Sequence, residues 1–269
     1  SLRTGIHEFQ YRGRSLEFAE YREYRSGEDL KDMDWKVFAR TDRYYLRQRD
    51  SHTPARVILL LDDSPSMRMK SGEAARSKLR ESQLLVFALG LILQRQGDPF
   101  SFHALSTNGP PIEARSSKGA LKKLMKVLEG LENTKFPEGK STQNWASVKN
   151  LNLDHLFCIS DFLVPLHKIE TWLDGFLRVS PKTQCVQVLD PLESGEGSEP
   201  SMVLDLENPQ LKRRVSSGDW DRYLENMEVH QQKLTEACRI RNIRLRKIQT
   251  NQPIATAIIS LLKESQRDI

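Results

Sequence analysis

The apolar positions along the chain predict strands and helices that alternate. Short, mainly apolar runs are typical of buried strands and occur at residues 57–61, 100–105, 156–159, 183–189 and 243–249. Apolar residues at three- and four-residue spacings predict helices at residues 73–96, 118–131, 165–179, 219–240 and 253–265. This alternation predicts an α/β fold with a doubly wound, mostly parallel sheet. Residues 111–115 are expected to pair with 100–105, and residues 202–206 with 213–216 as a hairpin at the sheet's edge.

The first part of the chain has a different pattern, because neither face of its strand-like segments is cleanly apolar. Residues 16–24 and 44–48 are expected to form strands, with a helical turn near residues 34–36 between them. We therefore predict a β-rich N-terminal extension at residues 1–54, packed on a main domain at residues 55–269. The dense mixture of charges and aromatic rings leaves two interpretations open, a solvated face of ion pairs or a docking surface for a partner.

The strand at residues 57–61 ends abruptly in polar residues that can bind a cation. Asp62, Ser64 and Ser66 follow it at a spacing of two, so their oxygen atoms can point to one side of an extended segment. In open α/β sheets, ligands bind beyond the carboxyl ends of the strands. Oxygen ligands suit Mg²⁺ best, with Mn²⁺ or Ca²⁺ as alternatives. The alternative is a strand that merely ends in polar turn residues.

This DxSxS pattern resembles the metal-ion-dependent adhesion site of von Willebrand factor A domains. In that family a Thr and an Asp from two later loops complete the site, and Thr142 and Asp161 fall in the right order here. The resemblance implies a von Willebrand factor A-like, Rossmann-like sheet. It also implies direct metal ligation by Asp62, Ser64, Ser66 and Thr142, and ligation by Asp161 directly or through water. Taken singly, Thr142 can be a helix cap and Asp161 an ordinary acid at a strand end.

A longer resemblance covers nearly the whole chain. The segment EYREYRSGEDLKDMDWKVFAR at residues 20–40, the YYLRQ that follows it and the DxSxS motif together resemble the bacterial domain of unknown function 58. Members of that family are typically found beside MoxR-type AAA+ ATPases. The resemblance therefore implies a MoxR-type ATPase, or a client protein that offers a Glu or Asp, as the partner.

Composition favours a soluble protein and gives little support to nucleic-acid binding. The formal net charge of +5 tolerates acidic partners, and the basic segments KRRVSS and RIRNIRLRK are interpreted as solvated faces. The sequence has no membrane-spanning run and no signal peptide, so a cytoplasmic location is expected, although the absence of an initiator Met allows a fragment. Cys158, Cys185 and Cys238 form no CxxC pair and are expected to be buried thiols.

These observations favour a non-catalytic adaptor that binds its partner through a metal ion. Asp62 and Asp161 are the only anions of the expected ligand set, so a bound Mg²⁺ keeps a position for an acidic side chain of the partner. Nearby basic residues are expected to attract such a surface, namely Arg68, Lys70, Arg76, Lys78 and Arg80. The alternatives are a structural interaction domain with a vestigial metal site and a metal-dependent hydrolase. The hydrolase has less support, since the six histidines show no ligand spacing. Oligomeric state stays open.

Overall fold

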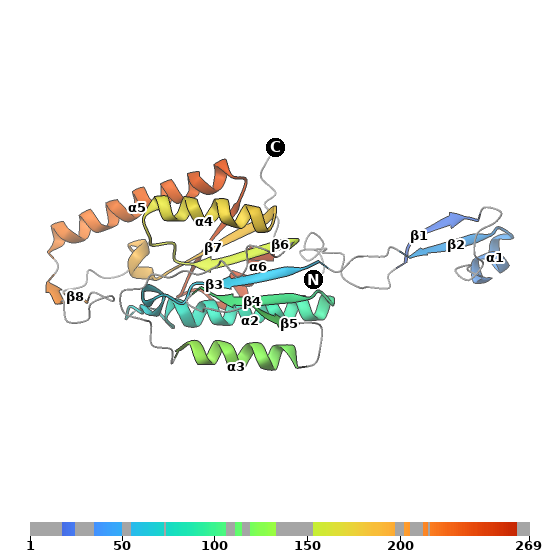
Figure 1. Ribbon diagram of the computed structural model, residues 1–269, viewed down its shortest axis with the longest axis horizontal. Helices are drawn as coiled ribbons and strands as arrows, with labels where there is room; N and C mark the ends of the chain where they lie inside the picture. Colours follow the sequence, from blue (N-terminus) through green and yellow to red (C-terminus); the bar gives the residue numbers. More distant parts are fainter. Residues whose placement is uncertain are drawn as a thin grey trace.

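The computed structural model describes residues 18–24, 35–49, 55–72, 74–105, 111–114, 119–132, 153–196, 202–204, 212–214 and 216–262. Its centre is a six-stranded sheet in the order β10-β7-β6-β3-β4-β5 (Figure 1). The strands are β3 (Val57–Leu61), β4 (Phe100–Ala104), β5 (Ile112–Ala114), β6 (His155–Ser160), β7 (Lys182–Leu189) and β10 (Arg244–Gln249). All neighbouring strands are parallel except β4 and β5, which are antiparallel. The predicted mostly parallel α/β sheet, and the antiparallel partner of β4, are thereby confirmed.

Helices cover both faces of this sheet. They are α2 (Lys78–Gln96), α3 (Ala120–Glu132), α4 (Leu166–Val179), α5 (Ser217–Ile240) and α6 (Ile254–Leu262). Buried residues of α2, α3 and α6 form one apolar core with the sheet, and buried residues of α4 and α5 form a second core on the opposite face (Figure 1). No helix among the described residues is long and apolar enough to cross a membrane.

Strand β3 is buried on both faces, as its unbroken apolar sequence predicts. Val57, Leu59 and Leu61 belong to the first core, whereas Ile58 and Leu60 belong to the second. Successive side chains of a strand point to opposite faces, so a strand covered on both sides must be apolar at every position. The register pairs Val57 with Phe100 on one side and with His155 on the other.

Helix α2 begins later than the sequence pattern predicts. The apolar spacing predicts a start at residue 73, but the helix begins at Lys78, and the Ser77 side chain caps it by accepting a hydrogen bond from Arg80 N at 3.2 Å. A short 3-10 helix, η2 (Pro65–Arg68), precedes it, and Pro65 suits the first turn of such an element. The segment after β3 therefore folds back over the end of the sheet before α2 starts.

Two small antiparallel pairs complete the described structure. In the N-terminal part, β1 (Phe18–Glu23) pairs with β2 (Tyr45–Arg49), and α1 (Trp35–Thr41) lies between them in sequence. This confirms the β-rich character of the extension, whereas its packing on the main domain stays a prediction. The expected pairing of β8 (Met202–Leu204) with β9 (Lys212–Arg214) also forms. It is a separate two-stranded sheet and adds no strand to the six-stranded one.

The strand order determines where a binding site can form. The chain passes from β3 to its neighbour β4 on one side, and later returns to β6 on the other side of β3. The connections that follow these two adjacent strands lead to opposite faces, because α2 covers the first core and α4 the second. Such a reversal opens a crevice at the carboxyl ends of the two strands. Asp62 follows β3 and Asp161 follows β6 at this point.

Candidate functional site

Asp62 lies at the end of β3 with its carboxylate buried. Its backbone N–H donates to Ile159 O at 2.8 Å, so the residue extends the pairing of β3 with β6. Its Oδ1 accepts from Ser64 N at 3.0 Å, and its Oδ2 accepts from Ser160 Oγ at 2.6 Å. Only 1% of Asp62 is exposed, and no ion pair with a basic side chain forms at it among the described residues. The carboxylate is therefore fixed in direction but has no positive charge paired with it there.

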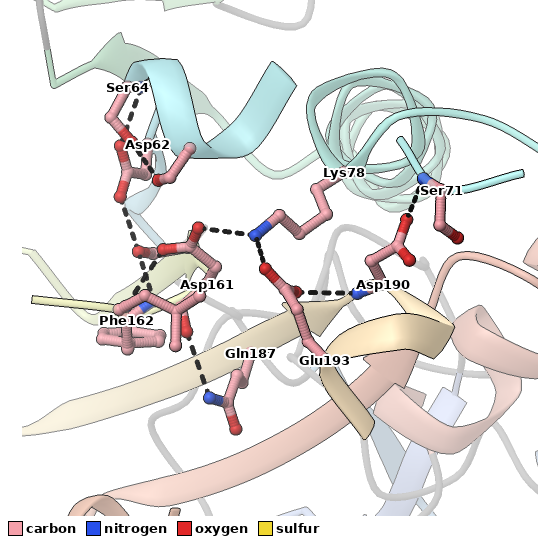
Figure 2. Close-up of polar contacts among 12 residues, drawn as sticks. Asp62, Ser64, Ser71, Lys78, Asp161, Phe162, Gln187, Asp190 and Glu193 are labelled. Atoms are coloured by element: carbon pink, nitrogen blue, oxygen red, sulfur yellow. Dashed lines mark hydrogen bonds and ion pairs between the residues drawn. The ribbon is translucent and has the colours of Figure 1, made fainter. Parts of the chain in front are cut away.

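The two serines of the motif lie side by side. Ser64 Oγ and Ser66 Oγ are 3.0 Å apart, and both side chains are half-buried (Figure 2). Ligands at adjacent corners of a Mg²⁺ octahedron with bonds near 2.1 Å are separated by about 3.0 Å. The spacing of the two hydroxyls thus matches one edge of such an octahedron. Ser64 thus contacts both Asp62 and Ser66, although Ser66 belongs to the 3-10 helix η2 rather than to the extended segment that the spacing of two predicts.

Asp161 points away from the serines toward a lysine that no local sequence pattern singles out. Its Oδ2 accepts from Lys78 Nζ at 2.8 Å, and its Oδ1 accepts from Leu163 N at 3.0 Å. Lys78 is completely buried at the start of α2 and also contacts Glu193 Oε1 at 2.5 Å (Figure 2). One ammonium group is thus shared by two buried carboxylates, one following β6 and one in η4 (Pro191–Ser194).

The Lys78 network extends to the loop after β7. Glu193 Oε2 accepts from Asp190 N at 2.9 Å, and Asp190 Oδ2 accepts from Ser71 N at 2.9 Å. Asp190 and Glu193 also form a capping box at the start of η4. The loops that follow β3, β6 and β7 are therefore joined by charged hydrogen bonds at one end of the sheet, as Figure 2 shows.

The turn after β6 is held in an uncommon conformation. Phe162 is buried with φ of 54°, in the left-handed region, where a non-glycine residue costs about 1–3 kcal/mol. Three contacts hold this turn: Phe162 N donates to Ser160 Oγ at 2.9 Å, Gln187 Nε2 donates to Asp161 O at 3.0 Å, and His230 Nε2 lies 2.8 Å from Phe162 O. These contacts fix the direction of the Asp161 side chain.

Burial and charge shift the pKa values of the site in different directions. Burial, and then the charge of Asp161, raise the pKa of Asp62 to about 6, against the hydrogen bonds from Ser160 and Ser64. Burial lowers the pKa of Lys78, but Asp161 and Glu193 outweigh it and leave that pKa above its ordinary value. Burial raises the pKa of Glu193, with Lys78 opposing the rise. Asp62 is therefore a buried carboxylate whose charged form a bound cation would stabilise.

The predicted ligand set is partly assembled. Asp62, Ser64 and Ser66 meet at the end of β3, Asp161 lies beside them in the Lys78 ion pair, and Thr142 lies outside the described residues. No three histidine, cysteine or carboxylate side chains in the described part of the chain gather as a metal site. A cation here would therefore depend on the hydroxyls of Ser64 and Ser66, which fit a hard ion, and on Asp62 as the free anion.

The basic group at residues 68–80 is only in part the exposed surface that the sequence indicated, since Lys70, Arg76 and Arg80 are exposed, Arg68 is half-buried and Lys78 is buried. Lys78 is buried, Arg76 pairs with Glu81 at 3.1 Å, and Arg80 pairs with Glu132 at 3.3 Å. Arg68 donates to two carbonyl groups at the end of α3. Only Lys70 of this group is exposed without such a contact among those described. These partners of Arg68, Lys78 and Arg80 lie 52 to 115 positions away along the chain, so a local pattern cannot show them, whereas Glu81 is five positions from Arg76.

All three cysteines are buried and free, as predicted, and they belong to the second core.

The family described as "Protein of unknown function DUF58" matches residues 20–202. The chain belongs to the DUF58 family. A search of curated proteins gave no match.

Among solved structures, the conserved hypothetical protein BatB from Bacteroides thetaiotaomicron is 15% identical, with a TM-score of 0.41 over 77% of this chain and 96% of that one. An aerotolerance-related membrane protein from Bacteroides fragilis, with multiple mutations to serines, is 13% identical, with a TM-score of 0.34 over 77% and 98%. An uncharacterized membrane spanning protein from Vibrio fischeri is 16% identical, with a TM-score of 0.22 over 77% and 96%.

Proposed function

We propose that this DUF58 protein is a non-catalytic, Mg²⁺-dependent adaptor that binds an acidic residue of a partner at Asp62, Ser64 and Ser66. The observation that carries the proposal is the arrangement of these three residues. Two half-buried hydroxyls lie 3.0 Å apart next to a buried carboxylate whose pKa is raised to about 6. A divalent cation would supply the positive charge that this carboxylate lacks.

The sheet topology supports a von Willebrand factor A-like arrangement of this site. Asp62 follows β3 and Asp161 follows β6, and the chain leaves these two neighbouring strands toward opposite faces of the sheet. In this arrangement Thr142, from a later loop, is the proposed further ligand. With one free carboxylate and neutral hydroxyls, a bound Mg²⁺ would keep both positive charge and coordination positions, which a Glu or Asp of a partner would fill.

The proposed partner comes from the family resemblance rather than from the site. DUF58 proteins are typically found beside MoxR-type AAA+ ATPases, so we propose such an ATPase, or a client protein that it remodels, as the bearer of the acidic residue. The N-terminal unit of β1, α1 and β2 offers an additional surface for this contact. Its Phe38 and Tyr44 rings stack with centroids 4.6 Å apart, and Tyr44 is about half exposed.

The Lys78 ion pair favours a second candidate, a structural interaction domain with a vestigial metal site. An ammonium group that already neutralises Asp161 removes part of the need for a metal ion. In that case the buried network would hold three loops together and the partner would bind elsewhere. Binding of Mg²⁺ in calorimetry separates the two candidates, because a vestigial site gives no heat of binding.

The hydrolase alternative gains no support from the site. Lys78 is held between two carboxylates and its pKa is raised, so it stays protonated and is unsuited to act as a general base. A screen with phosphatase and esterase substrates in the presence of Mg²⁺ tests this alternative. Activity that disappears in Asp62→Asn would favour the enzyme over the adaptor.

The adaptor proposal is tested by partner capture. The immobilised chain is mixed with a purified MoxR-type AAA+ ATPase in Mg²⁺ or in EDTA, and the Asp62→Ala variant is compared with wild type. The control, Glu129→Ala, removes an exposed carboxylate of α3 instead. We expect capture by wild type and the control only in Mg²⁺, and no capture by Asp62→Ala. Equal capture by all proteins in EDTA would overturn the metal-dependent mechanism.

A further inference from the structure

Lys78 combines two features that rarely occur together in a lysine. It is completely buried, and its single charge faces two carboxylates, at 2.8 Å from Asp161 and 2.5 Å from Glu193. Moving an ammonium group out of water costs several kcal/mol, so the pair persists only because both acids hold it. Helix α2 thus carries a fixed positive charge to the end of the sheet where Asp62 lies.

Asp161 connects this charge to the proposed site. The negative charge of Asp161 contributes to the raised pKa of Asp62, so the two carboxylates interact electrostatically. Ser160 connects them physically, since its hydroxyl donates to Asp62 Oδ2 and its backbone leads directly to Asp161. A cation bound at Asp62 would be attracted by Asp161, and the ammonium group that pairs with Asp161 would weaken that attraction.

Both oxygen atoms of Asp161 are already occupied. Lys78 Nζ donates to Oδ2 and Leu163 N donates to Oδ1, while the strained turn at Phe162 holds the Asp161 side chain in this direction. A divalent cation that recruited Asp161 as a ligand would therefore compete with the ammonium group of Lys78 for the same carboxylate. Asp62, Ser64 and Ser66 fit a cation, whereas Asp161 is already paired with Lys78.

We infer that Lys78 is an internal competitor of the divalent cation, which neutralises Asp161 and thereby keeps the cation affinity of Asp62, Ser64 and Ser66 low. The inference rests on the proposed function and adds its regulation. A site of low affinity retains Mg²⁺ only when the carboxylate of a partner completes the coordination. Cation and partner then bind cooperatively, and by linkage each raises the affinity for the other by the same factor.

The test compares Mg²⁺ and Mn²⁺ affinities by calorimetry in EDTA-stripped protein. The double variant Lys78→Met/Glu193→Gln removes one positive and one negative charge, so the net charge stays that of wild type and Asp161 is left without its cation. The control, Glu193→Gln, keeps Lys78 on Asp161 and differs from the double variant only at position 78. We expect the double variant to bind at least about tenfold tighter than wild type, and the control to bind no tighter.

The possible results separate this inference from the proposed function. Weak binding to wild type and tighter binding to the double variant would support both. Binding of the cation to the double variant but not to wild type would support the competing role of Lys78 and refute the metal dependence of the wild-type protein. Equal or weaker binding to the double variant would overturn the competitor and leave the metal site standing. No binding to either folded protein would overturn both.

A second measurement applies if the double variant does not fold. The buried ammonium group of Lys78 can be followed in wild type by nitrogen NMR of its Nζ. Because Asp161 pairs with Lys78 and also acts electrostatically on Asp62, saturation with Mg²⁺ should shift the Lys78 resonance, and Asp62→Ala should abolish this shift. A Lys78 resonance unchanged by Mg²⁺ would overturn the inference, whatever the effect of Lys78 on stability.

Discussion

Replacing Asp62 by asparagine should stabilise the metal-free protein at neutral pH, although Asp62 is the central residue of the proposed site. Burial and the charge of Asp161 raise the pKa of Asp62 from 3.8 to about 6. The ionised carboxylate therefore destabilises the fold above about pH 6, by about 3 kcal/mol at 1.36 kcal/mol per pKa unit. Asparagine keeps the size of aspartate and removes the charge.

Part of the stability gained in Asp62→Asn is offset because one hydrogen bond becomes weaker. In Asp62→Asn the amide oxygen of the new side chain can still accept from Ser64 N, but the Ser160 hydroxyl loses a charged acceptor, at a cost of about 1 kcal/mol. The expected net stabilisation is about 2 kcal/mol. Below about pH 3.8 the carboxyl group is neutral in both the folded and the unfolded chain, so the advantage should fade as the pH approaches 4.

Urea unfolding in EDTA at several pH values between about 4 and 7.5 measures this effect. The midpoint of Asp62→Asn should lie above that of wild type at the upper end of this range, and the two should converge toward the lower end. With saturating Mg²⁺ the order should reverse, because only wild type gains free energy from binding the ion. An asparagine variant that is less stable than wild type in EDTA at every pH would refute the electrostatic reasoning.

Three further predictions concern the rest of the fold. Gly90→Ala should destabilise the protein by about 1 kcal/mol in urea unfolding, because the new Cβ would lie 3.0 Å from Leu124 and Phe100. Gly130→Ala has open space around the new Cβ and should stabilise the protein by up to about 1 kcal/mol. Equal effects of the two substitutions would contradict this prediction. Burial and Lys182 lower the pKa of His155 to about 3, so the contribution of His155 to stability should fall as pH drops below 6.5, opposite in sign to that of Asp62, and an unchanged slope in His155→Gln would refute this. A thiol reagent should label no cysteine in native protein and all three in urea.

The elements of the main domain were predictable because their signals are local. The run at residues 57–61 is apolar at every position, and only a strand covered on both faces requires that. The polar residues that follow it are likewise visible in the sequence, and Ser64 and Ser66 do lie together, but Ser66 belongs to the 3-10 helix η2 and not to the extended segment that the spacing of two assumed. Element ends were less predictable, since α2 begins at Lys78 through the cap of Ser77 rather than where its apolar spacing starts.

The role of Lys78 could not be predicted from local pattern. It stands in the sequence ARSKLRES, where a lysine among arginines looks like part of a solvated basic surface. Its partners are far away in sequence, Asp161 at a separation of 83 residues and Glu193 at 115. Only the strand order β7-β6-β3 brings the ends of these segments together. For the same reason, the sequence did not show that Lys78 neutralises Asp161.

The central claim is that Asp62, Ser64 and Ser66 bind a divalent cation, and a Mn²⁺ titration followed by electron paramagnetic resonance tests it most directly. Free Mn²⁺ gives a sharp signal that disappears on binding, so the number and affinity of sites are read without a partner. The account predicts one site in EDTA-stripped wild type, displaced by Mg²⁺ and weakened at least about tenfold in Ser64→Ala/Ser66→Ala. Identical titrations of wild type and the double alanine variant, or no loss of signal in either, would contradict it.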